Sequence, residues 1–338
     1  MSAPSVSEPT PSEPTVSAEI HAVVGSGYMG GGIAQVLALA GHPVRIADVS
    51  VEVARSSRER LIAEAAAFAA DGLFPPGAEQ LIAERVSAHE LEDAVADARF
   101  IEEAVPEIPD LKRETLARIS AAAMPDAIIG SNTSSIAIGA MASAVLHPGR
   151  FLGVHFSNPS PFIPAVEIIP HEGTDPAVVA AASAIVRSVG KTPATVADRT
   201  GFVLNRLQFA LLNEAARVVE EGVASVEDVD AIIRGTLGFR LPFFGPFAIA
   251  DMAGLDTYGR VFEMLHQSYP DRFPTPAMLQ EAVDAGRYGV SKSGSGFLEA
   301  PVGGVEELVA YRNRAYVAMS RLLAELGPAP VVYAEERD

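Results

Sequence analysis

The chain has 338 residues, of which 49% are hydrophobic and 20% charged, a composition typical of a globular protein with a sizeable core. Its net charge of −18 argues against nucleic-acid partners and against binding to an anionic membrane. The absence of cysteine excludes disulfides, thiolate nucleophiles and cysteine-bound zinc, and it favours the cytoplasm.

The first 18 residues, MSAPSVSEPTPSEPTVSA, are rich in serine and proline and contain no apolar segment. They predict a disordered tail, since such a segment cannot bury enough apolar surface to fold. The tail also lacks the basic and apolar character of a targeting peptide. No uncharged apolar run in the chain approaches the roughly 18 residues of a membrane-spanning helix, so no membrane association is expected.

Short apolar strands alternate with helices as far as Asp198. Strands are expected at residues 20–24, 44–49, 98–105, 127–132, 150–156, 165–170 and 192–197. Helices are expected between Gly25 and Gly41, at 51–72, 77–86 and 110–123, and from Asp175-Pro176 onward. The alternation predicts an α/β fold with a Rossmann-like, doubly wound, mostly parallel sheet. The pair at 51–86 is longer than a simple crossover and predicts a helical hairpin insertion.

No convincing strand follows Asp198. Helices are expected at residues 201–222, 226–236, 246–267, 275–285 and 303–326. The sequence therefore predicts two domains, an α/β domain of residues 19–198 and an all-helical C-terminal domain of residues 199–338.

A glycine-rich turn, Gly25-x-Gly27-x-x-Gly30, follows the first strand and opens a helix. The first glycine permits a tight turn, the second lets the backbone approach a pyrophosphate, and the third lets the helix pack on the strand. Asp48 ends the second strand, where a carboxylate binds the ribose hydroxyls and repels a 2′-phosphate. Strand, glycines, helix, second strand and acid in this order predict NAD rather than NADP. The two glycines after Gly30 are expected to reduce bulk near the cofactor.

His155 has the most distinctive position of the seven histidines. It ends an apolar strand, at the edge where ligands bind in open α/β sheets. Oxidation of an alcohol needs a base that titrates near neutral pH, which imidazole provides. Glu167 lies in the next apolar strand and could orient the imidazole, although spacing alone leaves open that the two are unrelated buried residues. His21, in the first strand, is expected at an edge or on the surface.

Two further features are open to two interpretations each. The hydroxyl-rich segment SNTSS (131–135) follows an apolar strand, and it could bind a substrate oxygen or cap a helix. Tyr288-x-x-x-Lys292 matches the catalytic pair of short-chain dehydrogenases, but it lies far outside the expected Rossmann domain, which disfavours a catalytic role.

No histidine pair has helical spacing and no ligand set is recognisable, so no metal site is expected.

Seven motifs in this order resemble those of the L-3-hydroxyacyl-CoA dehydrogenases. They are GSGYMGGGIA (25–34), EEAVPE followed by Lys112 (102–112), SNTSS (131–135), HFSNP (155–159) with Glu167, GKTPATVADRTGFVLNRL (190–207), GPFAIADMAGLD (245–256) and SKSGSGF (291–297). The resemblance implies an N-terminal Rossmann-like NAD-binding domain, a helical substrate domain and a homodimer formed through that helical domain.

The resemblance also implies roles for individual residues. His155 is expected to be the general base and Glu167 its partner, while Ser134, Asn158 and Asn205 are expected to bind the substrate oxygen or position the cofactor, with Ser134 and Asn205 counted among the catalytic residues. The cofactor site is expected to consist of Gly25, Gly27, Tyr28, Met29, Gly30, Asp48, Glu107, Lys112 and Asn132, with Glu107 and Lys112 on the nicotinamide side.

Three departures from the family pattern concern the substrate. Ser157 stands where the family usually has an aromatic residue, and the segment FIPAVE contains Pro164. The segment 61–74 lacks the lysines that meet the CoA phosphates in acyl-CoA enzymes. Arginines 55, 58 and 60 lie a turn or more earlier and replace them only in part.

The expected activity is NAD-dependent oxidation of the hydroxyl of a 3-hydroxyacyl-CoA or a closely related 3-hydroxy acid. A dehydrogenase of a small free hydroxy acid or alcohol, of the gulonate, carnitine or pyridine-carboxylate type, is the alternative. A catalytically silent, crystallin-like NAD-binding protein is an alternative of another class. The β-hydroxyacid dehydrogenases are disfavoured, because they use a lysine on the first long helix of the second domain, where this chain has Asn205 and Arg206.

Overall fold

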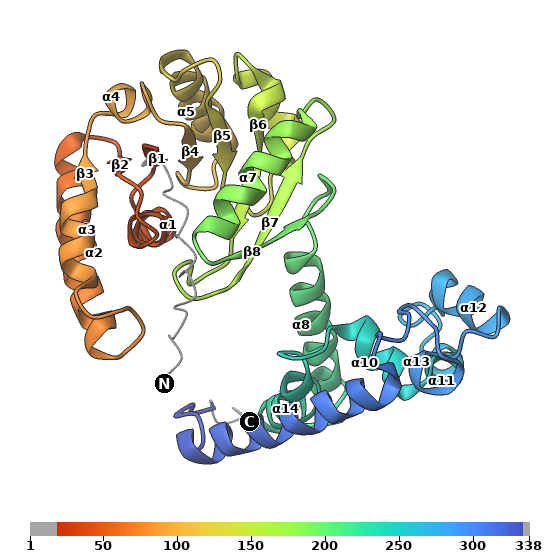
Figure 1. The fold of residues 1–338 in the computed structure, drawn as a ribbon. Helices are drawn as coiled ribbons and strands as arrows, with labels where there is room; N and C mark the ends of the chain where they lie inside the picture. Colours follow the sequence, from red (N-terminus) through yellow and green to blue (C-terminus); the bar gives the residue numbers. More distant parts are fainter. Residues whose placement is uncertain (1–18, 334–338) are drawn as a thin grey trace, which may run out of the picture. The chain divides into compact units, whose positions relative to one another are not determined.

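A computed structural model describes residues 19–333 of the chain. The tail expected to be disordered lies outside these residues. Contacts within the chain divide it into two units, Met1–Ala210 and Leu211–Asp338. The first unit contains a β-sheet with helices, and the second is helical (Figure 1).

One eight-stranded sheet organises the first unit, with the order β3-β2-β1-β4-β5-β6-β7-β8. Neighbouring strands are parallel except for the antiparallel pair β6–β7. The strands are β1 (His21–Val24), β2 (Val44–Ala47), β3 (Val86–Ala88), β4 (Phe100–Glu103), β5 (Ile128–Ser131), β6 (Phe151–Phe156), β7 (Ala165–Pro170) and β8 (Thr192–Thr195). The strand order reverses between β1 and β4, which confirms the doubly wound, mostly parallel sheet. In such sheets, ligands bind in the crevice at the carboxyl ends of the strands beside this reversal.

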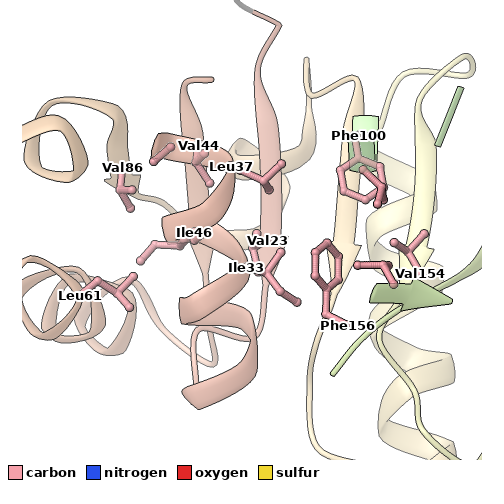
Figure 2. Close-up of a cluster of buried hydrophobic side chains, with 14 of the residues drawn as sticks. Val23, Ile33, Leu37, Val44, Ile46, Leu61, Val86, Phe100, Val154 and Phe156 are labelled. Atoms are coloured by element: carbon pink, nitrogen blue, oxygen red, sulfur yellow. The ribbon is translucent and has the colours of Figure 1, made fainter. Parts of the chain in front are cut away.

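Helices cover both faces of the sheet. One face carries α1 (Tyr28–Leu39), α2 (Val51–Ala70), α3 (Ala78–Arg85) and α7 (Pro176–Ser188), and the other carries α4 (Leu91–Val95), α5 (Pro109–Ala122) and α6 (Ile138–Met141). Figure 2 shows Ile33 and Leu37 of α1 beside the strand residues Val23, Phe100 and Phe156. Full burial of an aliphatic or aromatic side chain of this size contributes about 1.5–3 kcal/mol, so these two layers supply the stability of the unit.

The helical pair of α2 and α3 lies side by side in Figure 1 and leads directly into β3. Strand β3 is not predicted from the sequence, because its three residues are too few to show an alternating pattern. Since β3 pairs in parallel with β2, the two helices form the crossover between these strands.

The expectation that His21 lies at an edge or on the surface is wrong. Strand β1 pairs with β2 on one side and β4 on the other, and the His21 side chain is completely buried. Its ring centroid is 4.2 Å from that of His42 and 5.9 Å from that of Phe100. Burial, and to a lesser extent His42, lower the pKa of His21 to about 3, so the imidazole is neutral at physiological pH.

The second unit contains helices and, in its described residues, only isolated β-bridges. Helix α8 (Leu204–Glu220) spans the division between the units, and α9 (Val226–Ile233), α10 (Pro246–Ala253), α11 (Leu255–Ser268), α12 (Ala277–Asp284), α13 (Val290–Ser293) and α14 (Gly304–Leu326) follow. The single helix expected at 246–267 is wrong. Gly254 interrupts it with a φ of +107°, and a Cβ there would lie 2.5 Å from the side chain of Lys292.

Asp251 explains the glycine-rich segment around Lys292. Its buried carboxylate accepts hydrogen bonds from the backbone N–H groups of Val290, Phe297 and Leu298. The Lys292 ammonium lies 2.6 Å from the Asp256 carboxylate. The segment that contains the Tyr288/Lys292 pattern is therefore organised by structural contacts within the helical unit.

Candidate active site

The turn between β1 and α1 contains three glycines with different reasons for lacking a side chain. Gly25 has a φ of +96°, and a Cβ there would lie 2.6 Å from the Ala104 carbonyl. A Cβ on Gly30 would lie 1.9 Å from the Gly25 oxygen. A Cβ on Gly27 would meet no atom within 4 Å, and Gly27 lines a cavity. Packing requires the outer two glycines, whereas the bare backbone at Gly27 keeps space open in front of the helix N-terminus, as a bound pyrophosphate needs.

The two glycines after Gly30 do not serve the cofactor, so that expectation is wrong. A Cβ on Gly31 would lie 2.7 Å from Leu61 and 3.0 Å from Arg60, both on α2. A Cβ on Gly32 would lie 2.4 Å from the Ser160 hydroxyl. These glycines instead allow α2 and the loop between β6 and β7 to approach α1.

A cavity of about 620 Å³ lies at the carboxyl ends of the strands, where the strand order reverses. Its volume is within the usual range for small-molecule sites. Eight of the nine residues expected to bind the cofactor line it together with Ser134, namely Gly25, Gly27, Tyr28, Met29, Asp48, Glu107, Lys112 and Asn132. Gly30 does not line the cavity, because it packs against the turn. The glycine turn, the helix N-terminus and the carboxylate at the end of β2 all fit a dinucleotide.

Asp48 is held from two sides. Its Oδ2 accepts hydrogen bonds from the Ser26 N–H at 2.7 Å and the Ser26 hydroxyl at 2.6 Å, and its Oδ1 accepts one from the Val49 N–H at 2.8 Å. The two Oδ2 sites are filled, so Oδ1 is the oxygen with capacity for a ribose hydroxyl. Arg60 donates to the Ser26 carbonyl at 2.8 Å and ties the same turn to α2. The sequence did not predict these two contacts, because the glycine motif assigns no role to Ser26 and Arg60 comes from α2.

Lys112 forms the centre of a buried charge cluster. The lysine is 1% exposed, and its Nζ donates to Glu103 Oε1 at 2.8 Å and to the Val105 carbonyl at 3.0 Å. Glu107 Oε2 lies 3.4 Å from the same ammonium. The other oxygen of Glu103 accepts a hydrogen bond from the Ser131 hydroxyl at 2.6 Å. Because both charges have partners, their burial is tolerated. Glu103, which the sequence analysis did not single out, fixes the lysine at the cavity wall.

Glu107 organises the SNTSS segment. Its Oε1 accepts hydrogen bonds from the Thr133 hydroxyl at 2.6 Å, from the Ser134 N–H at 3.0 Å, and from the N–H and hydroxyl of Ser135, both at 2.9 Å. Partial burial opposes ionisation, but the hydrogen bonds and the charge of Lys112 outweigh it and lower the pKa of Glu107 to about 2. The carboxylate therefore caps this turn and leaves the Ser134 hydroxyl free for another partner.

His155 and Glu167 are direct cross-strand partners in the antiparallel pair β6–β7, which explains their spacing of twelve residues. The His155 Nδ1 lies 2.8 Å from Glu167 Oε2, and its Nε2 lies 3.0 Å from the Ser134 hydroxyl. Both side chains of the pair are buried. The carboxylate can only accept a hydrogen bond, so it assigns the proton of the neutral imidazole to Nδ1 and directs the Nε2 lone pair toward Ser134.

The remaining oxygen of Glu167 binds the start of α8. Oε1 accepts hydrogen bonds from the N–H groups of Val203 at 2.9 Å and Leu204 at 3.0 Å. Burial raises the pKa of Glu167, but the bonds from His155 and from these two N–H groups outweigh burial and lower it below its ordinary value. The carboxylate is therefore charged at neutral pH and can stabilise a protonated imidazole.

The three asparagines expected in the site have different surroundings. Asn205 Nδ2 donates to the Ser134 carbonyl at 2.8 Å and supports that residue from the first turn of α8. Asn132 Oδ1 accepts a hydrogen bond from the Phe156 N–H at 2.8 Å and joins the ends of β5 and β6. Asn158 is exposed in the loop that follows β6.

Residues 19–333 contain neither a cluster of metal ligands nor a membrane-spanning helix. No three histidine, aspartate or glutamate side chains lie together in a way that could hold a metal ion. Within the same residues, no helix is both long and apolar enough to cross a membrane.

Family models place the chain among known proteins. The model of the 3-hydroxyacyl-CoA dehydrogenase NAD binding domain matches residues 21–199, and that of the C-terminal domain of the same enzymes matches residues 201–300. The chain is 35% identical over 303 residues to 5-formyl-3-hydroxy-2-methylpyridine 4-carboxylate 5-dehydrogenase of Mesorhizobium japonicum, covering 89% of this chain and 97% of the relative. It is 36% identical over 278 residues to 3-hydroxybutyryl-CoA dehydrogenase of Bradyrhizobium diazoefficiens, covering 82% and 94%.

A solved structure gives the same result. The crystal structure of a 3-hydroxyacyl-CoA dehydrogenase from Archaeoglobus fulgidus is similar with a TM-score of 0.75 and 31% identity, covering 91% of this chain and 99% of that one. The motifs, the doubly wound sheet and the two consecutive family models agree. The chain belongs to the 3-hydroxyacyl-CoA dehydrogenase family, whose members are NAD-dependent oxidoreductases that act on a CH–OH group.

Proposed function

We propose that the protein oxidises the hydroxyl of a 3-hydroxyacyl-CoA, or of a closely related 3-hydroxy acid, to the 3-oxo compound. The observation that carries this proposal is the hydrogen-bonded series of Ser134, His155 and Glu167 beside the cavity that fits NAD. It provides a proton acceptor and a charged partner at the edge of the sheet where the cofactor binds.

NAD, when bound, supplies the hydride acceptor. His155 Nε2 takes the hydroxyl proton, since its lone pair faces the Ser134 side of the cavity. Glu167 holds the ring through Nδ1 and stabilises the imidazolium, as the acid does in a catalytic triad. Ser134 binds the substrate oxygen, and Asn205 positions Ser134 through its carbonyl. Asn158 contacts the substrate from the loop after β6.

The cofactor residues have separate roles in this proposal. Gly25, Gly27 and Gly30 shape the pyrophosphate site at the start of α1, and Tyr28 and Met29 form the cavity wall beside it. Asp48 binds the adenosine ribose through Oδ1. Glu107, Lys112 and Asn132 line the nicotinamide side. We also place the boundary between the α/β domain and the helical C-terminal domain between residues 198 and 199.

A second candidate is a small free hydroxy acid, and one observation favours it. CoA carries phosphates that need free cations, but the arginines of the α2–α3 pair are largely engaged. Arg58 donates to backbone carbonyls of α3 and β3, Arg60 to that of Ser26, and Arg85 to that of Ala38. Few free cations remain on this pair for an adenosine phosphate.

A substrate panel tests both candidates. We expect reduction of NAD, followed as absorbance of NADH, with 3-hydroxybutyryl-CoA giving the highest kcat/KM among that thioester, free 3-hydroxybutyrate, gulonate and carnitine. Turnover of a free acid without turnover of the thioester would select the second candidate. Binding of NAD without turnover of any compound would contradict both and support a catalytically silent protein.

We also propose that the protein is a homodimer formed through the helical unit. Large apolar side chains are exposed there, among them Leu211, Leu212, Val261, Met264, Val317, Leu322, Leu323 and Leu326. Exposed apolar residues in this number are typical of a surface that a partner covers. Sedimentation equilibrium should give twice the chain mass of 35.4 kDa, and a monomer at micromolar concentration would contradict the proposal.

A further inference from the structure

Lys191 is a buried cation whose partners are all backbone carbonyls. The residue is 8% exposed and lies between α7 and β8. Its ammonium donates to the carbonyls of Ser160 at 2.9 Å, Pro161 at 2.8 Å and Ile163 at 2.7 Å. An ammonium has three N–H donors, so every donor has a partner. Across residues 19–333, no carboxylate forms an ion pair with it, so the lysine is committed to this loop.

The loop that Lys191 binds, residues 157–164, joins β6 to β7 and begins two residues after His155. The loop contains Asn158, which contacts the substrate in the proposed function. Lys191 binds three carbonyls of this loop, so its side chain fixes one side of the loop that connects the two strands of the His155–Glu167 pair.

The other side of this loop contacts the cofactor turn. Ser160 is 1% exposed, and its hydroxyl donates to the Met29 carbonyl at 3.1 Å. Met29 lines the cavity that fits NAD. Gly32 leaves the space for this contact, because a Cβ there would lie 2.4 Å from the Ser160 hydroxyl and 2.8 Å from Pro161. The loop is thus fixed between the lysine and the first turns of α1.

We propose that Lys191 is a positioning residue that, through loop 157–164, sets the distance between the substrate-binding Asn158 and the cofactor turn at Met29. The inference rests on the proposed function of Asn158. The lysine touches neither substrate nor cofactor, and it acts by fixing the loop between them. Loss of such positioning costs turnover more than it costs cofactor binding, because a displacement of about 1 Å can lower a rate by about 100-fold.

The test compares Lys191→Met with Arg150→Met as the control. Arg150 also donates to a backbone carbonyl of the first unit, that of Ala127, but this contact lies at the amino end of β5, away from the cavity. We expect Lys191→Met to lower kcat/KM for the hydroxy substrate by about 10- to 100-fold, while the Kd for NAD changes by less than about threefold. Arg150→Met should leave kcat/KM within about twofold, even if its Tm falls as much as that of Lys191→Met.

Two further measurements keep the test decisive. Hydrogen exchange of the 157–164 amides needs no substrate, and it should accelerate in Lys191→Met but not in Arg150→Met. If Lys191→Met does not fold, Ser160→Ala, which removes only the bond to Met29, should lower kcat/KM by about fivefold, the value of one ordinary hydrogen bond. Unchanged loop exchange, or equal losses of kcat/KM in Lys191→Met and its control, would overturn the inference. Failure of the wild-type protein in the substrate panel would instead refute the proposed function.

Discussion

Replacing His155 with alanine should lower kcat by about two to four orders of magnitude, the usual contribution of a general base. The variant loses the acceptor at Nε2, and the buried Glu167 carboxylate loses the ring that it orients. The Kd for NAD should change by less than about threefold, since His155 does not line the cavity. Steady-state NADH formation at saturating substrate measures kcat, and a fluorescence titration measures binding. A kcat near that of the wild type would refute the assignment of the base.

Asp48→Ala should have the opposite effect to His155→Ala, because it should weaken NAD binding and leave kcat nearly unchanged. The carboxylate lines the cavity but lies outside the hydrogen-bonded series at His155. Its removal should raise the Kd for NAD about tenfold, as expected for one hydrogen bond to a charged group, and should narrow the preference over NADP. At saturating NAD, kcat should remain within about twofold of the wild type. An unchanged ratio of NAD to NADP affinity would contradict the ribose contact.

Much of the site follows from the sequence, because its main residues occur where strands end. Carboxyl ends of parallel strands meet at one edge of the sheet, so residues as distant as Asp48 and Asn132 line one cavity. The contact between His155 and Glu167 follows less directly. It requires β6 and β7 to be antiparallel, and two apolar strands separated by a short loop do not by themselves specify the direction of pairing. The family resemblance supplied that information.

The contacts that position the site could not be predicted in this way. Glu107 gathers four hydrogen bonds from the SNTSS turn onto one oxygen, and Lys191 binds three carbonyls of a loop that is 28 to 31 residues away in sequence. Their partners are mostly backbone groups, which every residue has. No residue pattern therefore marks such contacts before the fold is known. The same holds for Gly31 and Gly32, whose neighbours come from α2 and loop 157–164.

The environment of Glu102 is also not evident from the sequence. The pair Glu102-Glu103 reads as two similar acids in one strand, but successive residues of a strand face opposite sides of the sheet. Glu103 meets Lys112 and Ser131, whereas Glu102 is completely buried on the other face. Within residues 19–333, neither oxygen of Glu102 has a hydrogen-bond partner. A Cβ on the neighbouring Gly130 would lie 2.3 Å from Glu102 Oε2, so the carboxyl group fills the space that this glycine leaves.

Substitution of Glu102 by glutamine should therefore stabilise the protein, and increasingly so as the pH rises. Burial, reinforced by the charge of Glu103, raises the pKa of Glu102 well above its ordinary value. The unfolded chain releases this proton above about pH 4.3, while the folded protein retains it. The wild type consequently loses about 1.4 kcal/mol of unfolding free energy per pH unit between the unfolded and the folded pKa, a loss that the variant does not share.

Urea denaturation of both proteins at pH 5, 6 and 7 isolates this effect, because all other titrating groups are common to the two. The difference in unfolding free energy should grow with pH over this range, by about 1.4 kcal/mol per unit wherever the pH lies below the folded pKa of Glu102. Glu102→Val should add a constant gain of about 1–3 kcal/mol, since it also removes the unsatisfied polar atoms. Glu172→Gln, at an exposed position, should give a curve parallel to that of the wild type. A parallel curve for Glu102→Gln would mean that the folded protein ionises this carboxyl group as readily as the unfolded chain, which its burial without a partner should prevent.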